Sequence, residues 1–347
     1  MIKVITDATT KTGVGKYAFF LAEALSSELI SMRKDNTKVL GDYGGRVFSG
    51  VRTGGLSTGY YLNERFPGLF FHQCYTYLNR ESGDNMILHY SNPGIRKFNI
   101  KARSVVTFHD LFPLKIRSGD RTNKLKVKNF ESFKGAEHML TISNVMKSEL
   151  EQSDFSGKIK VVYHPVSSTF VKLPETKEQL RKELNLPVNR KLILSISTNS
   201  PVKNLDIVDK TVKSLGDGYK LVRVGPPVSD SIVFNGVSEE TLNRIYNACD
   251  ALLMPSSEEG FGFPVIEAFA TGLPVVVSDI DIFREITKGS AILSRIDPQT
   301  LKESLEEAIG NGEKYAEKGI KTAEFYSFEN FRKNMVEYYA KELDVSF

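Results

Sequence analysis

Features that mark several protein classes are scarce or missing in this 347-residue chain. There are two cysteines, Cys74 and Cys249, and no Cys-x-x-Cys pair, so neither a disulfide framework nor a structural zinc site is expected. No stretch approaches ~18 consecutive apolar residues, which argues against a membrane-spanning helix. The first residues, MIKVIT, have the pattern of a strand rather than a signal peptide, so we expect a cytoplasmic protein.

Net charge is also small, at +4, but it is unevenly distributed. Residues 96–134 contain eleven Lys or Arg and three Asp or Glu, a net charge of +8. Such a segment suits contact with phosphates, nucleic acid or an anionic membrane surface. A basic face that is simply solvated is the alternative, because most charge runs are of that kind.

Short apolar runs alternate with longer amphipathic segments along the chain, which is typical of parallel sheets covered by helices. A helix is expected at 17–29, and a charged segment at 173–187 separates two such series. The expected strands are 2–6, 85–90, 104–110, 138–143, 158–166, 191–197, 219–225, 231–236, 250–256 and 273–278. The sequence therefore predicts an α/β protein of two doubly wound domains, which bind ligands beyond the carboxyl ends of their strands.

A glycine loop between a strand and a helix is the most informative local feature, EEGFGFPVIEAFATG at 258–272. Pro264 suits the first position of a helix, and Gly272 suits the residue just past its end. The free N–H groups of Gly262, Phe263, Val265 and Ile266 would then lie at the positive end of a helix dipole. Anions, phosphate above all, bind at such ends.

Two glutamates, Glu259 and Glu267, flank this predicted anion site, although carboxylates repel phosphate. Carboxylates accept hydrogen bonds from pairs of hydroxyls, so a ligand with a central diphosphate and a sugar at each end would suit both. Nucleotide sugars have this chemistry. The alternative is that Glu267 only complements the helix dipole, and the residues alone leave both interpretations open.

The stretch EGFGFPVIEAFATGLPVVVS resembles the E-x7-E signature of family 4 glycosyltransferases, retaining enzymes with the GT-B fold. VSEETLNRIYNACDALLMPSSEEGFG before it, and GVGKY, FHDLFPL and LTISN nearer the N-terminus, are similar to a mannosyltransferase-like subgroup. The resemblance implies two Rossmann-like domains facing across a cleft. An acceptor domain would cover 1–168 and a nucleotide-sugar donor domain 169–326, with a helix at 327–347 packing back toward the first.

The resemblance also implies roles for individual residues. Glu267 would bind the ribose hydroxyls, and Glu259 the donor-sugar hydroxyls near the reacting carbon. Lys203 would neutralise the diphosphate, and His109 would face the donor sugar from the other domain. The remaining donor contacts would come from the backbone of Gly13, Gly15, Val237, Gly262 and Phe263.

The predicted activity is retaining transfer of a hexose, mannose or glucose, from a GDP- or UDP-linked donor to a hydroxyl of a glycan or lipid-linked acceptor. The donor is a substrate, and neither a cofactor nor a metal is expected, because the groups above would stabilise the leaving diphosphate. Residues 112–134 interleave lysines with Phe and Leu in the acceptor domain. Our hypothesis is that they contact an anionic membrane at its inner face; no nucleic-acid partner is expected.

Alternative functions are suggested by one difference from the family pattern and by two weaker motifs. Many relatives carry a second base shortly before the lysine, whereas here the run is SISTNSPVKN. A nucleotide-sugar-binding protein without transferase activity, or an epimerase or phosphorylase on the same fold, is therefore the main alternative. GVGKYA outlines a dinucleotide site but lies too far from its strand. Asp279 and Asp281 would suit a divalent metal, or are simply loop and helix-start acids.

Overall fold

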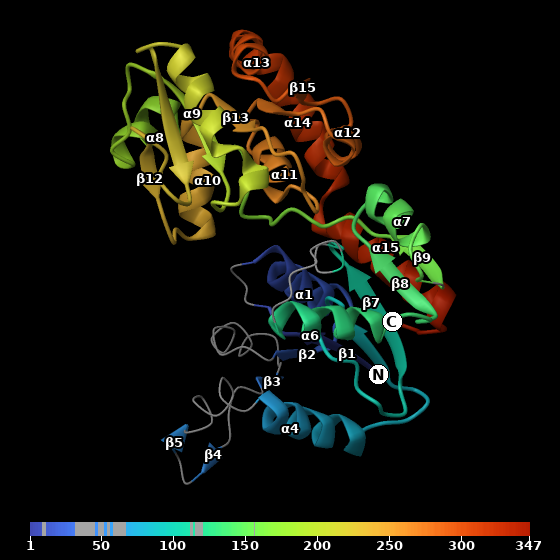
Figure 1. Cartoon of the computed structure of the whole chain (residues 1–347). Coiled ribbons are helices and arrows are strands. Elements are labelled where there is room, and N and C mark those ends of the chain that lie inside the picture. Colours follow the sequence, from blue (N-terminus) through green and yellow to red (C-terminus); the bar gives the residue numbers. More distant parts are fainter. Residues whose placement is uncertain are drawn as a thin grey trace. The chain divides into compact units, whose positions relative to one another are not determined.

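The protein, seen here as a computed structural model, forms two compact units (Figure 1). The structure describes residues 1–8, 12–31, 46–47, 52–53, 56–57, 67–111, 114, 121–155 and 157–347. One unit consists of Met1–Pro165 with Glu329–Phe347, and the other of Val166–Phe328. These divisions lie within a few residues of the expected boundaries at 168 and 326.

The first unit is built on a seven-stranded parallel sheet in the order β3-β2-β1-β6-β7-β8-β9. A two-stranded antiparallel ribbon, β4 with β5, is separate from it. The strands are β1 Ile2–Thr6, β2 Glu28–Ser31, β3 Arg46–Val47, β4 Arg52–Thr53, β5 Leu56–Ser57, β6 Ile87–Tyr90, β7 Arg103–Phe108, β8 His138–Thr141 and β9 Lys158–Val161.

The start of this unit differs from the sequence prediction. The first helix, α1, spans Gly13–Ala24 rather than 17–29, and it begins where the Thr12 side chain accepts a hydrogen bond from the Gly15 N–H. Residues 28–31 form strand β2 instead, pairing in parallel with β1. Lys3 on β1 is buried and forms an ion pair with Glu28, which fixes this register.

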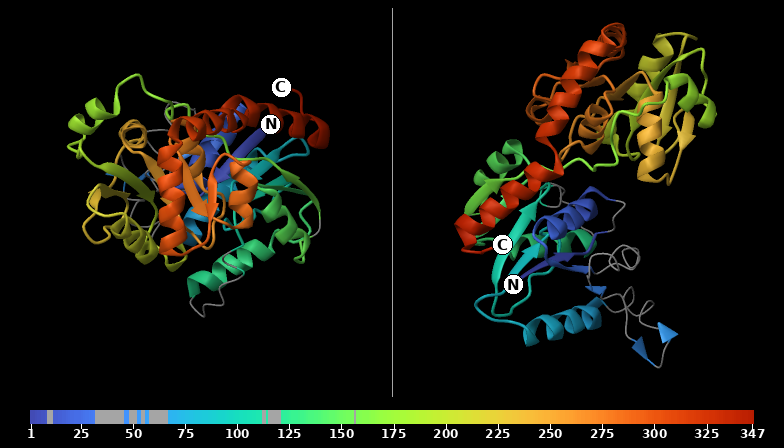
Figure 2. Two further views of the ribbon diagram at one scale, coloured as in Figure 1. Left: turned by 90° about the horizontal axis from the view of Figure 1, so that it is seen from above. Right: turned by 180° about the vertical axis from the view of Figure 1, so that it is seen from behind.

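The remaining helices of this unit include the last helix of the chain. They are α4 Pro67–Arg80, α6 Arg121–Glu131, α7 Asn144–Glu151 and α15 Phe328–Leu343. Both orientations in Figure 2 show α15, in red, with the elements of the first unit. Its apolar stripe is buried at Phe331, Met335 and Tyr339, and the Arg103 guanidinium donates to the Leu343 carbonyl at 2.6 Å. None of the described helices is long and apolar enough to cross a bilayer.

The second unit contains a six-stranded parallel sheet in the order β12-β11-β10-β13-β14-β15. Its strands are β10 Lys191–Ile196, β11 Tyr219–Val224, β12 Ile232–Phe234, β13 Ala251–Met254, β14 Val275–Ser278 and β15 Ile292–Ser294. Its helices are α8 Lys177–Glu183, the 3-10 turn η2 Pro201–Lys203, α9 Leu205–Ser214, α10 Glu239–Ala248, α11 Phe263–Ala270, α12 Asp281–Thr287, α13 Pro298–Gly310 and α14 Gly312–Phe325.

The strand order of the second unit decides where a ligand would bind. Chain connections leave β10 and β13 toward opposite sides of the sheet, because β11 lies beyond β10 and β14 lies beyond β13. A crevice forms at such a reversal, outside the carboxyl ends of the two strands. The loops that follow β10 and β13 carry Lys203 and Glu259, so the fold brings these two side chains to one edge.

Candidate functional site

The centre of the candidate site is an ion pair between Lys203 and Glu259. The Lys203 Nζ lies 2.6 Å from the Glu259 Oε1, and the two side chains are 17% and 10% exposed. The hydroxyl of Ser256 donates to the same carboxylate oxygen at 2.9 Å. Two residues that the resemblance assigned to different parts of a ligand are therefore direct partners of each other.

The loops that carry this pair are held together by further hydrogen bonds. The Asn204 side chain donates to the Pro255 carbonyl at 2.8 Å, and the Ser257 N–H donates to the Val202 carbonyl at 2.8 Å. Asn204 has a left-handed backbone, with φ of 51°, which ends η2 and starts α9. The position of Lys203 against Glu259 is thus fixed by the backbone as well as by charge.

Helix α11 starts beside Glu259 and differs slightly from the predicted helix. It begins at Phe263, so Pro264 occupies the second position rather than the first. Gly262 precedes it with φ of 96°, and a Cβ there would lie 3.0 Å from the Phe283 ring, which explains the glycine. The Val265 N–H donates to the Gly262 carbonyl at 2.9 Å, so it is not available to an anion as expected.

Glu267 lies in the second turn of α11 and is only 5% exposed. The phenol of Tyr246, on α10, donates to its Oε2 at 2.7 Å. Tyr246 is fully buried, and burial first, then the Glu267 carboxylate, raises the pKa of this phenol well above its usual range. A carboxylate that accepts a hydrogen bond in a buried position is oriented rather than free to swing, as a ligand-binding group should be.

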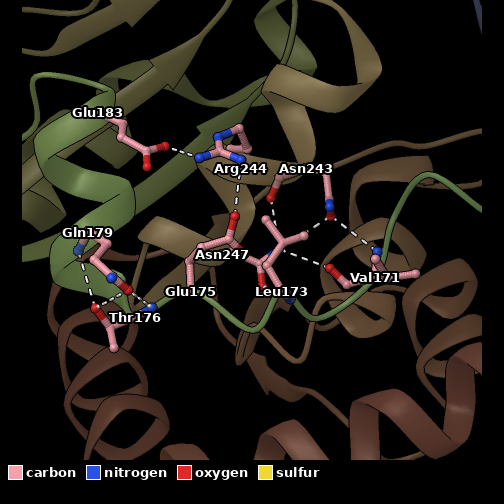
Figure 3. A network of polar contacts seen from close by, with 9 residues as sticks. All are labelled: Val171, Leu173, Glu175, Thr176, Gln179, Glu183, Asn243, Arg244 and Asn247. Carbon is pink, nitrogen blue, oxygen red and sulfur yellow. Dashed lines mark hydrogen bonds and ion pairs between the residues drawn. The ribbon is translucent and has the colours of Figure 1, made fainter.

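Helix α10 is in turn anchored by the segment that enters the second unit (Figure 3). Asn243 accepts from the Val171 N–H at 3.1 Å, and Asn247 accepts from the Leu173 N–H at 2.9 Å. Arg244 forms ion pairs with Glu175 and Glu183. This network fixes the helix from which Tyr246 holds Glu267.

The other expected backbone contacts are distributed over both units. Val237 is half-buried between β12 and α10, at the same sheet edge as Lys203. Gly13 and Gly15 lie in the first turn of α1, in the first unit. The Gly15 N–H donates to the Thr12 side chain at 3.1 Å, so a phosphate would have to displace that cap to reach it.

His109 belongs to a buried hydrogen-bonded cluster in the first unit. Its Nε2 lies 2.7 Å from the Ser91 carbonyl, which only accepts, so Nε2 carries the proton. Its Nδ1 lies 3.0 Å from the His164 Nε2. Burial lowers the pKa of His109 to about 4, so the imidazole is neutral at pH 7. A donor sugar would have to displace one of these partners to bind a ring nitrogen.

Sequence reasoning found no partners for two further histidines of this cluster. His89 lies with its two ring nitrogens 2.7 Å from the Tyr339 and Thr107 hydroxyls. Burial lowers its pKa to about 3, and His164 shows a strong lowering from the same cause. His89 lies on β6, whereas His164 follows β9, so the parallel sheet is what brings these residues, which are distant in the sequence, into one cluster.

The Asp279 and Asp281 pair is occupied by a cation from the protein. Arg284 contacts the two oxygens of Asp279 at 2.6 and 2.9 Å and reaches Asp281 at 3.4 Å. The guanidinium lowers the pKa of Asp279 below its usual range. This arrangement agrees with loop and helix-start acids.

Known proteins share both the fold and part of the sequence. Sucrose-phosphate synthase from Thermosynechococcus elongatus is 18% identical, with 99% of each chain covered and a TM-score of 0.74. HepE from Anabaena, solved in complex with UDP and glucose, is 16% identical, covers 98% of this chain and 99% of its own, and has a TM-score of 0.77. At these identities the likeness shows the fold, which is the expected GT-B.

A sequence relative and a family description add to this likeness. O-antigen chain mannosyltransferase RfbU from Salmonella typhimurium is 30% identical over 199 residues, and the chain spans about half of RfbU's length, 52%. Residues 176–325 match the family Glycosyl transferases group 1, and this stretch contains Lys203, Glu259 and Glu267. The similarity to the glycosyl transferases group 1 family thus covers residues 176–325, within a chain that has the GT-B fold.

Proposed function

We propose that this protein is a hexosyltransferase that moves a sugar from a nucleotide-sugar donor to a hydroxyl of a glycan or lipid-linked acceptor. The observation that carries the proposal is the pair of Lys203 and Glu259, held beside the start of α11 at the β10 and β13 edge. Glu267, fixed by Tyr246, adds a second carboxylate to the same helix. These groups suit a diphosphate with a sugar at each end.

Each group would have one role in the reaction. Lys203 would bind the diphosphate, Glu267 the ribose and Glu259 the hydroxyls of the transferred hexose. The bond from the anomeric carbon to the phosphate oxygen breaks, and a bond to the acceptor oxygen forms. Lys203 and the N–H groups at Gly262 and Phe263 would stabilise the charge that develops on the leaving diphosphate. The acceptor proton would pass to that phosphate. The acceptor would then attack the anomeric carbon from the face that the phosphate leaves, so the configuration of that carbon would be retained.

The identity of the donor and of the acceptor is also part of the proposal. RfbU is a mannosyltransferase and HepE was solved with UDP and glucose, which favours GDP-mannose and UDP-glucose as candidates. His109 is proposed to act at the donor sugar after giving up one ring contact. No metal is proposed, because Lys203 and the N–H groups at the start of helix α11 would contact the diphosphate directly.

Contact with a lipid-linked acceptor is proposed to involve the basic segment 112–134. Residues 112–113 and 115–120 lie outside the described part of the chain. In α6, Leu125 is 57% exposed between the exposed lysines 124 and 126, which suits an anionic surface. Flotation that is equal for anionic and zwitterionic liposomes would remove this part of the proposal.

The experiment that tests the proposed activity has two steps. A thermal-shift panel of GDP, UDP, ADP and their sugars identifies the base, because ligands that bind only the folded state raise its melting temperature. Release of nucleoside diphosphate is then measured with the selected donor and an acceptor mixture, using Lys203→Met as the inactive control. Binding without release would identify a nucleotide-sugar-binding protein, and no binding in the panel would refute both.

A further inference from the structure

Arg223 is a buried cation that the proposed function leaves without a role. It lies on β11, and its side chain is 0% exposed. Its guanidinium donates to the Ser195 hydroxyl at 2.8 Å, the Ser197 carbonyl at 3.0 Å, the Ser197 hydroxyl at 3.4 Å and the Pro226 carbonyl at 3.3 Å. All of these acceptors are neutral. Among the described residues no carboxylate lies within ion-pair distance of it.

Burying an arginine at this position costs free energy in the folded protein when no ligand is bound. Burial lowers the pKa of Arg223 to about 10, which still leaves it charged at pH 7. A buried charge normally has an opposite charge beside it, since hydrogen bonds to neutral groups only partly replace water. Strand β11 itself buries Val222, and the neighbouring strand β10 buries Leu194, so an apolar side chain would fit the pattern of buried residues here.

The location of Arg223 links it to the diphosphate subsite. In the sheet register it pairs with Ser195, one residue before the end of β10. Ser197 starts the loop that runs through η2 to Lys203. Neighbouring strands lie about 4.8 Å apart, so β11 is about 10 Å from β13, whose following loop carries Glu259. Arg223 therefore lies beneath the same edge of the sheet as the Lys203 and Glu259 pair.

We propose that Arg223 is the second cationic group of the diphosphate subsite, acting from beneath the loop between β10 and η2. This inference rests on the proposed function. Lys203 is ion-paired with Glu259, so that pair contributes no net charge toward a ligand. A diphosphate needs a net positive field, and Arg223 is a cation at this edge that no carboxylate of the described residues pairs with. It is a positioning residue, because its charge reaches the ligand through Ser197 and the loop.

Arg223 can also act on the ligand through the Ser197 hydroxyl, to which its guanidinium donates. A hydroxyl that accepts a hydrogen bond from a guanidinium has its own proton left to donate, and polarisation strengthens that donation. Ser197 is half-buried and follows the strand end directly, so its hydroxyl is placed to donate to an anion at this edge. The base that is missing from the run before Lys203 would thus be replaced by one on the adjacent strand.

The test compares ligands with and without phosphate. The wild type, Arg223→Met and Arg223→Lys are titrated with the nucleoside diphosphate selected by the thermal-shift panel and with the matching nucleoside. We expect Arg223→Met to weaken binding of the diphosphate on the order of tenfold, with nucleoside affinity unchanged and a shallower salt dependence. Arg223→Lys keeps the charge and should recover most of the loss.

Lys220→Met is the matched control. Lys220 lies on the same strand but toward its amino end, and it is already ion-paired with Asp230, so its removal should leave diphosphate affinity unchanged. Arg223→Met should melt lower than the wild type, because the Ser197 and Pro226 carbonyls lose the guanidinium as donor, so affinities are compared below the melting temperature of every variant. Should it fail to fold, Arg223→Gln gives the same comparison.

The outcomes separate this inference from the proposed function. If the wild type binds the diphosphate and Arg223→Met binds it equally well, Arg223 has no part in the subsite and only this inference fails. If nucleoside and diphosphate affinity fall by the same factor, Arg223 merely shapes the loop, and the inference is again overturned. If the wild type binds no nucleotide, both the proposed function and this inference fail.

Discussion

Replacing Glu259 by glutamine should tighten binding of the free nucleoside diphosphate while it slows sugar transfer. The Glu259 carboxylate contacts the Lys203 ammonium at 2.6 Å, with both side chains largely buried. A phosphate that approaches Lys203 therefore meets a carboxylate already there. Glutamine has nearly the same shape and keeps an acceptor for the Ser256 hydroxyl, so the change removes the charge and little else.

The magnitude follows from the separation of the charges. A phosphate bound to Lys203 would lie about 5 Å from the Glu259 carboxylate, and like charges at that distance repel by about 3 kcal/mol at an effective dielectric constant of about 20. Solvent reaches the 10% of the Glu259 side chain that is exposed and screens part of this repulsion, so we take about half of this value. Glu259→Gln should therefore raise diphosphate affinity about tenfold, which corresponds to about 1.4 kcal/mol.

Calorimetric titration with the diphosphate measures this effect in a double-mutant cycle of Glu259→Gln and Lys203→Met. Glu258→Gln is the matched control, because Glu258 is exposed, adjacent in the sequence and carries the same charge. The gain should disappear in the Lys203→Met background. Equal or weaker diphosphate binding by Glu259→Gln would refute the reasoning, since phosphate would then not bind at Lys203.

Three further predictions concern the supports of the site. Tyr246→Phe removes the hydrogen bond to the buried Glu267, so it should cost about 1–3 kcal/mol of unfolding free energy and weaken nucleoside binding, as urea denaturation and titration would show. An unchanged free energy of unfolding and an unchanged nucleoside affinity would contradict the role of Tyr246 in holding Glu267. Gly262→Ala should destabilise by about 1–3 kcal/mol, because φ is 96° and a Cβ would press on Phe283, and it should reduce diphosphate affinity. Gly310→Ala, with open space around it in a helix, is its control. Finally, His89, His109 and His164 are neutral and buried with lowered pKa values, so the unfolded chain binds more protons. Their contribution to the free energy of unfolding is complete above a pH of about 6.5. It is lost as pH falls below that value, at about 1.4 kcal/mol per pH unit for each histidine. Urea unfolding between pH 7.5 and 5.5 would show a flat profile if these histidines were accessible.

Much of the fold could be predicted because its signals are local and periodic. All ten expected strands are present, and buried β13 and β14 follow from unbroken apolar runs, as parallel sheets require. The helix start at α11 was predicted to within one residue from Gly262 and Pro264. Strands β2 and β15 and the two-residue strands β3, β4 and β5 were missed. Residues 28–31 continue a helical pattern, but pairing with β1 and β3 and the contact of Glu28 with Lys3 make them a strand.

The candidate site could be predicted only in part, because a motif names residues but not their partners. Lys203 and Glu259 were both selected, yet their contact depends on the order of β10 and β13 in the sheet, which no local pattern encodes. Arg223 and His89 were overlooked for the opposite reason: each interrupts an apolar strand and so resembles a solvent-facing position. A signal was nevertheless present in the run YKLVRVG, where a charge follows two apolar residues of a strand expected to be buried on both faces. The side chain of such a residue must be buried, because both faces of the strand are covered. Where the strand also ends at a ligand-binding edge, the cost of burying the charge makes that residue a candidate for function from its sequence position alone.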